Sequence, residues 1–183
     1  MKNNNNIKTV VAIGIGAALF FVLGRFVAIP SPVPNTNISL QYAVLGLLAA
    51  MYGPVAGCLI GFIGHTLIDL SWGGSPWWSW VIASAVVGLV VGLFAKKIQV
   101  QEGDFGKGKV VIFTIANVIA HALSWILVAP ALDILIYAEP VNKVFAQGAF
   151  AAVSNAITGI VVGGLLILAY TKTMAKKGSL DQE

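Results

Sequence analysis

The stretch Gly64–Trp80, GHTLIDLSWGGSPWWSW, concentrates side chains that could bind a ligand. It contains His65, Asp69 and four of the five tryptophans of the chain. His65 and Asp69 are four residues apart, so a helix places them on one face, where an imidazole and a carboxylate can pair. Two interpretations remain open: the pair contacts a ligand, or it only holds two helices together.

A second polar stripe lies further along the chain. Asn117, His121 and Trp125 are spaced four residues apart, so they form one face of a helix. The His121 imidazole can donate or accept a hydrogen bond, which makes it the best single ligand candidate. Asn155 is the next candidate, because an amide can pair with both donor and acceptor edges of a heterocycle.

The tryptophans divide by their expected depth. Trp72, Trp77 and Trp78 lie where an aromatic belt at a membrane interface is expected. Trp80 and Trp125 lie deeper, where stacking on a flat ligand competes with packing. The candidate substrate-binding residues are therefore Trp80, His121, Trp125, Asn155, His65 and Asp69.

The elements that position these residues must lie in a bilayer. Of the 183 residues 58% are hydrophobic and 10% are charged, and the mean hydropathy is +0.89. A soluble domain of this size could not bury so much apolar surface. The net charge of +4 comes from lysines at segment ends, which indicates membrane topology and argues against nucleic acid as a partner. The single Cys58 favours neither a disulfide nor a metal cluster.

A helix that crosses the hydrocarbon needs about 20 mostly apolar residues. The sequence predicts a single all-α membrane domain over 1–183, a bundle of six transmembrane helices. In the alternative with five spans, Leu40–Trp72 is one kinked element, although Gly53-Pro54 is typical of a tight turn. The expected spans are 7–29, 40–52, 55–72, 77–95, 110–128 and 145–170.

Charge predicts the orientation. With the N-terminus inside, nine lysines face the cytoplasm and only Arg25 and Lys143 lie outside, as the positive-inside rule requires. Both termini are then cytoplasmic in a multi-pass membrane protein. The segment 96–109 is a basic cytoplasmic loop, and the tail 174–183 is expected to be frayed.

Polar side chains gather in the outer half of the predicted bundle, whereas the inner halves carry almost none. This asymmetry predicts a polar cavity open to the outside and closed near the midplane. The outer segment IPSPVPNTN has three alternate prolines, which favour a stiff, extended chain. It could be a lid over the cavity or a plain connector.

Two nucleotide-like motifs are incomplete. The segment GDFGKGKV places Val110 where a phosphate-binding loop needs serine or threonine, and GIGAAL from Gly14 lacks the third glycine of a dinucleotide fold. No cofactor is therefore expected. A membrane enzyme that uses His65, Asp69 and His121 with a metal is a rival, but no established metal motif is present.

The first span carries small residues at intervals of four, which allow another helix to approach closely. Packing within the bundle and docking of another protein both remain possible. Two further small-residue faces, Gly57–Gly64 and Gly159–Gly164, raise the same question. The candidate partner-docking residues are Ala12, Gly14, Gly16 and Ala18.

The chain resembles the S components of energy-coupling factor (ECF) transporters from about Ile7 to Lys172. The resemblance rests on VVAIGIGAALFFVLGRFVAIPSPVPNT, GPVAGCLIGFIGHTLID and GGSPWWSWVIAS. These strings are similar to a branch described as riboflavin-type and linked elsewhere to hydroxymethylpyrimidine or pyridoxine.

The resemblance implies a vitamin-binding membrane subunit, not an enzyme. Its partners would be a transmembrane coupling protein (the T component) and two cytoplasmic ATPases. In the family an A-x-x-x-A motif on the first helix docks the coupling protein, and here Ala12-x-x-x-Gly16 and Gly14-x-x-x-Ala18 take its place. Hydroxymethylpyrimidine and pyridoxine are the first substrate candidates and riboflavin is the next. An independent secondary transporter or channel is the alternative, but it predicts internal repeats and polar groups in both leaflets.

Overall fold

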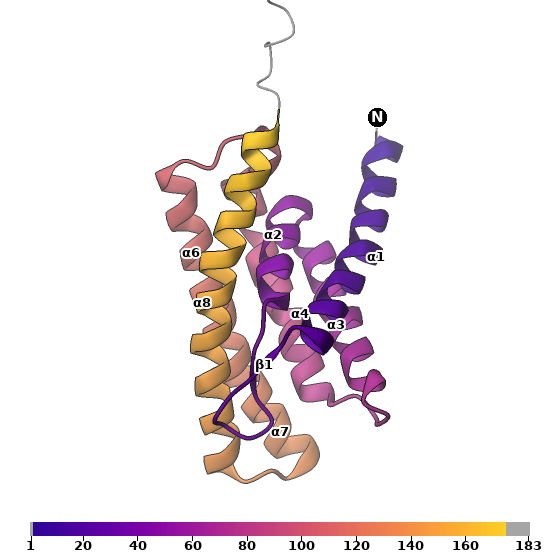
Figure 1. Ribbon diagram of the computed structural model, residues 1–183, viewed down its shortest axis with the longest axis vertical. Coiled ribbons are helices and arrows are strands. Elements are labelled where there is room, and N and C mark those ends of the chain that lie inside the picture. Colours follow the sequence, from indigo (N-terminus) through magenta and orange to yellow (C-terminus); the bar gives the residue numbers. More distant parts are fainter. Residues whose placement is uncertain (1, 175–183) are drawn as a thin grey trace, which may run out of the picture.

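Helices make up most of the chain (Figure 1). The structure is a computed structural model that describes residues 2–174, with side chains from Asn6 onward. The helical elements are α1 (Lys2–Phe26), α2 (Gln41–Tyr52), α3 (Pro54–Ser71), α4 (Trp78–Leu93), α5 (Ala95–Ile98), η1 (Val100–Glu102), α6 (Lys107–Ala122), the π-helical segment η2 (Leu123–Val128), α7 (Ala129–Tyr137) and α8 (Val141–Thr173).

Five helical runs within residues 2–174 are long and apolar enough to cross a membrane. The short helix α2 has 12 residues and is apolar as well. It lies in the middle of the bundle and contacts α1, α3, α4 and α8, which shield it (Figure 1). The predicted all-α membrane bundle is therefore confirmed, with α2 as its short central member. The runs are Asn6–Phe26, Pro54–Ser71, Trp78–Glu102, Lys107–Tyr137 and Val141–Thr173.

Several helix ends differ from the expected spans. The first helix stops at Phe26, because the next residues enter a hairpin. The expected span 110–128 continues through η2 and α7 to Tyr137, and Pro130 fits because it lies in the first turn of α7. The expected loop 96–109 contains the short helices α5 and η1. Apart from Met174, the tail 174–183 lies outside the described residues.

The proline-rich segment forms a small antiparallel hairpin of β1 (Ile29–Pro30) and β2 (Asn37–Ile38). Its turn closes through a hydrogen bond from the Thr36 hydroxyl to the Val33 carbonyl at 2.6 Å. Asn35 adopts a positive φ of 58°, a conformation that asparagine tolerates better than most residues. The alternate prolines thus form a folded hairpin rather than an extended strand.

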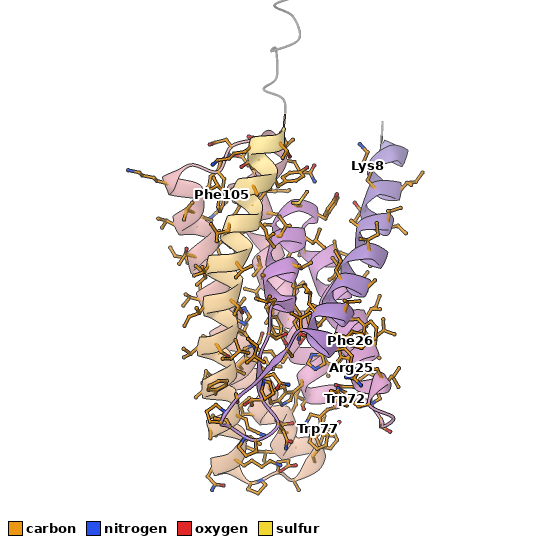
Figure 2. All side chains as sticks on the ribbon, in the orientation of Figure 1. Lys8, Arg25, Phe26, Trp72, Trp77 and Phe105 are labelled. Atoms are coloured by element: carbon orange, nitrogen blue, oxygen red, sulfur yellow. The ribbon has the colours of Figure 1, made fainter. Side chains whose placement is uncertain are left out.

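Both ends of the described chain lie at one end of the bundle, and the hairpin and α7 lie at the opposite end (Figure 1). Lys8 is at the first end and Arg25 at the second (Figure 2). By the positive-inside rule the end with the chain termini is cytoplasmic. The end with the hairpin and α7 is called the outer end below.

Glycines bring α3 and α4 into direct backbone contact. A Cβ atom built on Gly57 would lie 2.2 Å from the Gly88 carbonyl oxygen, and one built on Gly88 would lie 2.0 Å from the Gly57 oxygen. Gly61 meets the Ser84 carbonyl in the same way, at 2.3 Å. Close approach of this kind stabilises helix pairs in a bilayer, where apolar side chains gain little by leaving lipid. The Gly57–Gly64 face is therefore used within the bundle.

The substitution Gly88→Ala is expected to lower the free energy of unfolding by about 3 kcal/mol, because the new methyl group must separate two backbones. Thermal unfolding in detergent measures the change. Gly164→Ala is the matched control on α8, since a Cβ there meets nothing within 4 Å. Equal melting temperatures for the two variants would contradict the predicted backbone contact.

Candidate functional site

A cavity of about 720 Å³ opens at the outer end of the bundle. The ends of α1, α2, α3, α4, α7 and α8 and the hairpin form its wall, so each of these elements contributes residues to one site. Its charged residues are Arg25, Asp69, Asp133, Glu139 and Lys143. Its aromatic residues are Tyr42, His65, Trp72, Trp77 and Trp80.

The carboxylate of Asp133 on α7 organises the aromatic part of this wall. It is 3% exposed and accepts hydrogen bonds from the indole N–H of Trp77 at 2.7 Å, from the indole N–H of Trp80 at 3.1 Å and from the Ser79 hydroxyl. All three donors come from the start of α4. These three hydrogen bonds replace the hydrogen bonds to water that the carboxylate loses on burial. Because two of the donors are indole N–H groups, one buried acid fixes the orientation of two cavity-wall tryptophans.

A second acid holds the start of α4 from the other side. The Oδ2 atom of Asp69 on α3 accepts the backbone N–H of Trp77 at 2.8 Å. The Tyr137 hydroxyl accepts the backbone N–H of Trp78 at 2.9 Å, and the Tyr137 ring stacks on Trp77 with centroids 3.9 Å apart. These contacts satisfy backbone donors that every helix N-terminus leaves free, and they place negative charge where the helix dipole favours it.

Polar side chains connect the cavity wall with the bundle interior. His65 Nε2 lies 3.7 Å from Asp69 Oδ1, too far for a direct hydrogen bond. His65 Nδ1 lies 2.6 Å from the Ser84 hydroxyl, which in turn lies 2.9 Å from the Tyr42 hydroxyl. His65 therefore joins α3 to α4 and α2 through Nδ1, and its Nε2 atom lies nearest to Asp69, another residue of the cavity wall.

The mouth of the cavity is closed in part by the hairpin. Asn35, Thr36 and Asn37 line the cavity, and the Gln147 side chain on α8 donates a hydrogen bond to the Pro34 carbonyl at 2.8 Å. The hairpin is thus fastened across the opening to the far helix. A lid that opens and closes would have to break this hydrogen bond as well as the packing of β2 against α8.

The substitution Gln147→Ala removes this fastening. It is expected to raise the dissociation rate of a bound ligand about fivefold, since one neutral hydrogen bond contributes about 1 kcal/mol. Stopped-flow release after dilution measures the rate. Gln101→Ala is the control, because Gln101 donates to the Met51 carbonyl at the other end of the bundle. Unchanged release in the Gln147 variant would make the hairpin a plain connector.

Charged residues at the mouth differ in their pairing. Lys143 and Glu139 form an ion pair at 2.6 Å. The Arg25 guanidinium lies 3.7 Å from the centre of the Trp72 ring, a cation–π contact between the ends of α1 and α3 (Figure 2). Figure 2 places Arg25, Trp72 and Trp77 together at the outer end.

The structure brings four of the six candidate binding residues to the cavity wall: Trp80, His65, Asp69 and Asn155. The other two do not line it. His121 and Trp125 are fully buried, and the Trp125 indole N–H donates to His121 Nδ1 at 3.0 Å. Trp125 supports the wall from behind, because its ring lies 5.2 Å from Trp80 and 5.8 Å from Tyr42.

Asp133 is not among the candidate binding residues that the sequence suggested. The sequence did contain an indication of its role. A single carboxylate in an apolar segment requires hydrogen-bond donors, and Trp77 and Trp80 have indole N–H groups that can donate. The partners are more than fifty residues apart, however, so spacing alone could not connect them.

The structure divides the candidate docking residues of α1 into two faces. Ala12 and Gly16 are buried, and a Cβ on Gly16 would meet Leu48 at 2.6 Å. Gly14 and Ala18 are exposed, and a Cβ on Gly14 meets nothing within 4 Å. Ala12-x-x-x-Gly16 thus packs inside the bundle, and Gly14-x-x-x-Ala18 faces outward.

No group of three His, Cys, Asp or Glu side chains within the described residues lies close enough to hold a metal ion.

The fold and the cavity define a helical membrane protein with a binding site open at one end. The family model described as "ECF-type riboflavin transporter, S component" matches residues 4–172. The chain belongs to this family of ECF transporter S components, and the resemblance seen in the sequence is confirmed.

The chain is also similar to curated relatives and to a solved structure. A UPF0397 protein of Clostridium perfringens strain SM101 is 53% identical over 182 residues, which cover 100% of this chain and 98% of the relative. A UPF0397 protein of Enterococcus faecalis strain V583 is 49% identical over 183 residues and covers 100% of both chains. The crystal structure of the S component for biotin from an ECF-type ABC transporter superposes with a TM-score of 0.65. It is 19% identical over 97% of both chains, so it supports the fold alone.

Proposed function

We propose that this protein captures a small planar vitamin or vitamin precursor at the outer face of the bacterial plasma membrane, for ATP-driven uptake. The observation that carries the proposal is the cavity at the outer end, whose wall combines oriented tryptophans with hydrogen-bonding groups. A site of this composition suits a flat heterocycle with a few polar substituents.

The ligand contacts proposed are Trp80, Asn155, His65 and Asp69. Asp133 holds the Trp80 indole in place, so the ring face remains free for stacking. The amide of Asn155 and Nε2 of His65 supply hydrogen bonds. His121 and Trp125 do not line the cavity, and Trp125 supports the Trp80 ring from behind the wall.

Hydroxymethylpyrimidine and pyridoxine remain the favoured substrates, and riboflavin is the next. Two wall tryptophans of fixed orientation and a small set of polar groups suit a single ring. The cavity volume of about 720 Å³ lies within the range of about 300–1000 Å³ that is common for small-molecule sites, so it also admits the larger riboflavin.

Tryptophan fluorescence of the purified protein, titrated with these three compounds and thiamine, tests the proposal. Saturable quenching by one compound, weakened at least tenfold in Trp80→Phe or Asn155→Leu, is the expected result. Lys109→Ala at the cytoplasmic end is the control. No response to any compound would refute the proposed substrate class.

Import also requires partners with an energy source. We propose that a transmembrane coupling protein and two cytoplasmic ATPases work with this chain. The incomplete nucleotide motifs of the sequence are consistent with an ATPase on separate subunits. The outward face of Gly14 and Ala18 is the proposed contact with the coupling protein, since it is exposed and has no partner within the described chain.

A further inference from the structure

Four buried polar atoms between the α6–η2 segment and α8 have no hydrogen-bond partner among the described residues. Asn117, His121 and Ser124 are fully buried, and Asn155 is 4% exposed. Buried polar atoms are nearly always paired, so a cluster of four such atoms requires an explanation. The π-helical segment η2 begins next to them, and such segments are frequent at functional sites. The atoms are Asn117 Oδ1, His121 Nε2, Ser124 Oγ and Asn155 Oδ1.

Two hydrogen bonds determine which of the two central atoms, His121 Nε2 and Asn117 Oδ1, is a donor and which is an acceptor. The Trp125 indole can only donate, so His121 Nδ1 is the acceptor and the proton of the neutral imidazole is on Nε2. The Asn117 amide donates to the Phe113 carbonyl at 2.9 Å, which assigns its other atom as the oxygen. The cluster therefore presents one N–H donor and at least one acceptor.

These two atoms converge on the face of α8 where Gly159 has no side chain. A Cβ atom built on Gly159 would lie 2.8 Å from Asn117 Oδ1 and 3.4 Å from His121 Nε2. Its next nearest neighbour, Asn117 Cγ, is 3.7 Å away. Glycine at this position thus brings the α8 backbone close to a donor and an acceptor.

The cluster is continuous with the cavity. Asn155 lies one turn before Gly159 on the same face of α8, and it also lines the cavity wall. The Tyr42 ring, another part of that wall, lies edge-on to His121 with centroids 5.3 Å apart. One of the four unpaired atoms therefore belongs to a residue of the cavity wall, and His121 lies directly behind that wall.

We propose that this cluster is an inner compartment of the site, which binds a hydroxyl group. A hydroxyl can accept the His121 Nε2 proton and donate to Asn117 Oδ1 or Asn155 Oδ1. A cation does not fit, because His121 Nε2 is a proton donor among the acceptors of the cluster. A water molecule and a hydroxyl group of the substrate can both make these hydrogen bonds. Only binding of a substrate hydroxyl rests on the proposed function.

Crystal structures of the full chain, without ligand and with pyridoxine or riboflavin, test the compartment. A water within hydrogen-bond distance of His121 Nε2 and Asn117 Oδ1 in both structures supports it with water as the ligand. Replacement of that water by a hydroxyl of the added vitamin supports it with the substrate as the ligand. Direct contact between His121 and Asn117, with no third group between them, would overturn the proposal.

Solution measurements separate the compartment from the vitamin proposal. Histidine ¹⁵N spectra of the detergent-solubilised protein should show the Nε2–H form of His121, and the Nδ1–H form would overturn the assignment.

Gly159→Ala should weaken binding of pyridoxine or riboflavin about tenfold if a substrate hydroxyl enters, and less than twofold if water stays. Gly164→Ala is the matched control, with no expected change. If neither vitamin binds, the proposed substrates fail, while the ligand-free structure and the spectra still decide the compartment.

Discussion

Replacing Asp133 with asparagine is expected to weaken vitamin binding by about 10- to 100-fold, the effect of one to two unpaired hydrogen-bond donors. Both carboxylate oxygens are used: Oδ1 accepts from Trp77 and Ser79, and Oδ2 accepts from Trp80. The amide of asparagine has only one oxygen, and its NH₂ group must then face a donor. The Trp80 or Trp77 ring is therefore released from the cavity wall.

Tryptophan fluorescence titration with the vitamin that binds the wild-type protein measures this loss, and near-UV circular dichroism reports the released indole. Asp104→Asn is the matched control, because Asp104 pairs with Lys109 far from the cavity. It is expected to leave the dissociation constant within about twofold of the wild type. Normal affinity in Asp133→Asn, with the protein still folded, would show that the acid does not position the wall.

The bundle and its polar outer half could be predicted because both follow from local pattern. The sequence alone contains the apolar runs of membrane length, the break at Gly53 and Pro54, and the lysines at the ends of the runs. The pair His65 and Asp69 is also local, since four residues of helix bring the two side chains to one face. Trp80 was predicted to be a binding residue because of its expected depth in the membrane.

The contacts across the bundle could not be predicted in the same way. The spacing of Asn117, His121 and Trp125 correctly defines one helix face, but periodicity does not tell which neighbour covers it. Here Gly159 lets α8 approach so closely that the stripe is buried behind the cavity wall. Asp133 was missed for a related reason: the π-helical segment continues the helix beyond its expected end and carries this acid to the tryptophans of α4.

Gly14 and Gly16 show why small-residue motifs need a structure before they can be assigned. Their spacing allows close approach on two faces of α1, and the sequence treats these faces alike. In the folded chain a Cβ on Gly16 collides with Leu48 and Ile60, whereas Gly14 is open. One motif therefore builds the bundle, and the other is free for a partner.

Gly14→Leu is expected to abolish ATP-driven vitamin uptake while vitamin binding to the isolated protein stays within about twofold of the wild type. A Cβ atom at this position meets nothing within 4 Å, so we expect the fold to be retained. The leucine does prevent another helix from approaching the α1 backbone, and helix association in a bilayer depends on that approach. Co-purification of the coupling protein and the ATPases with a tagged chain measures assembly, and uptake of labelled vitamin into cells measures transport.

Gly164→Leu on α8 is the matched control, because a Cβ at this position is equally unobstructed. Assembly lost in the Gly14 variant and retained in the Gly164 variant would assign docking to α1. The opposite result would move the partner contact to the α8 face, and loss in both would show that the coupling protein contacts both helices. Full assembly in both variants would refute small-residue docking, because neither face would then require a close backbone approach.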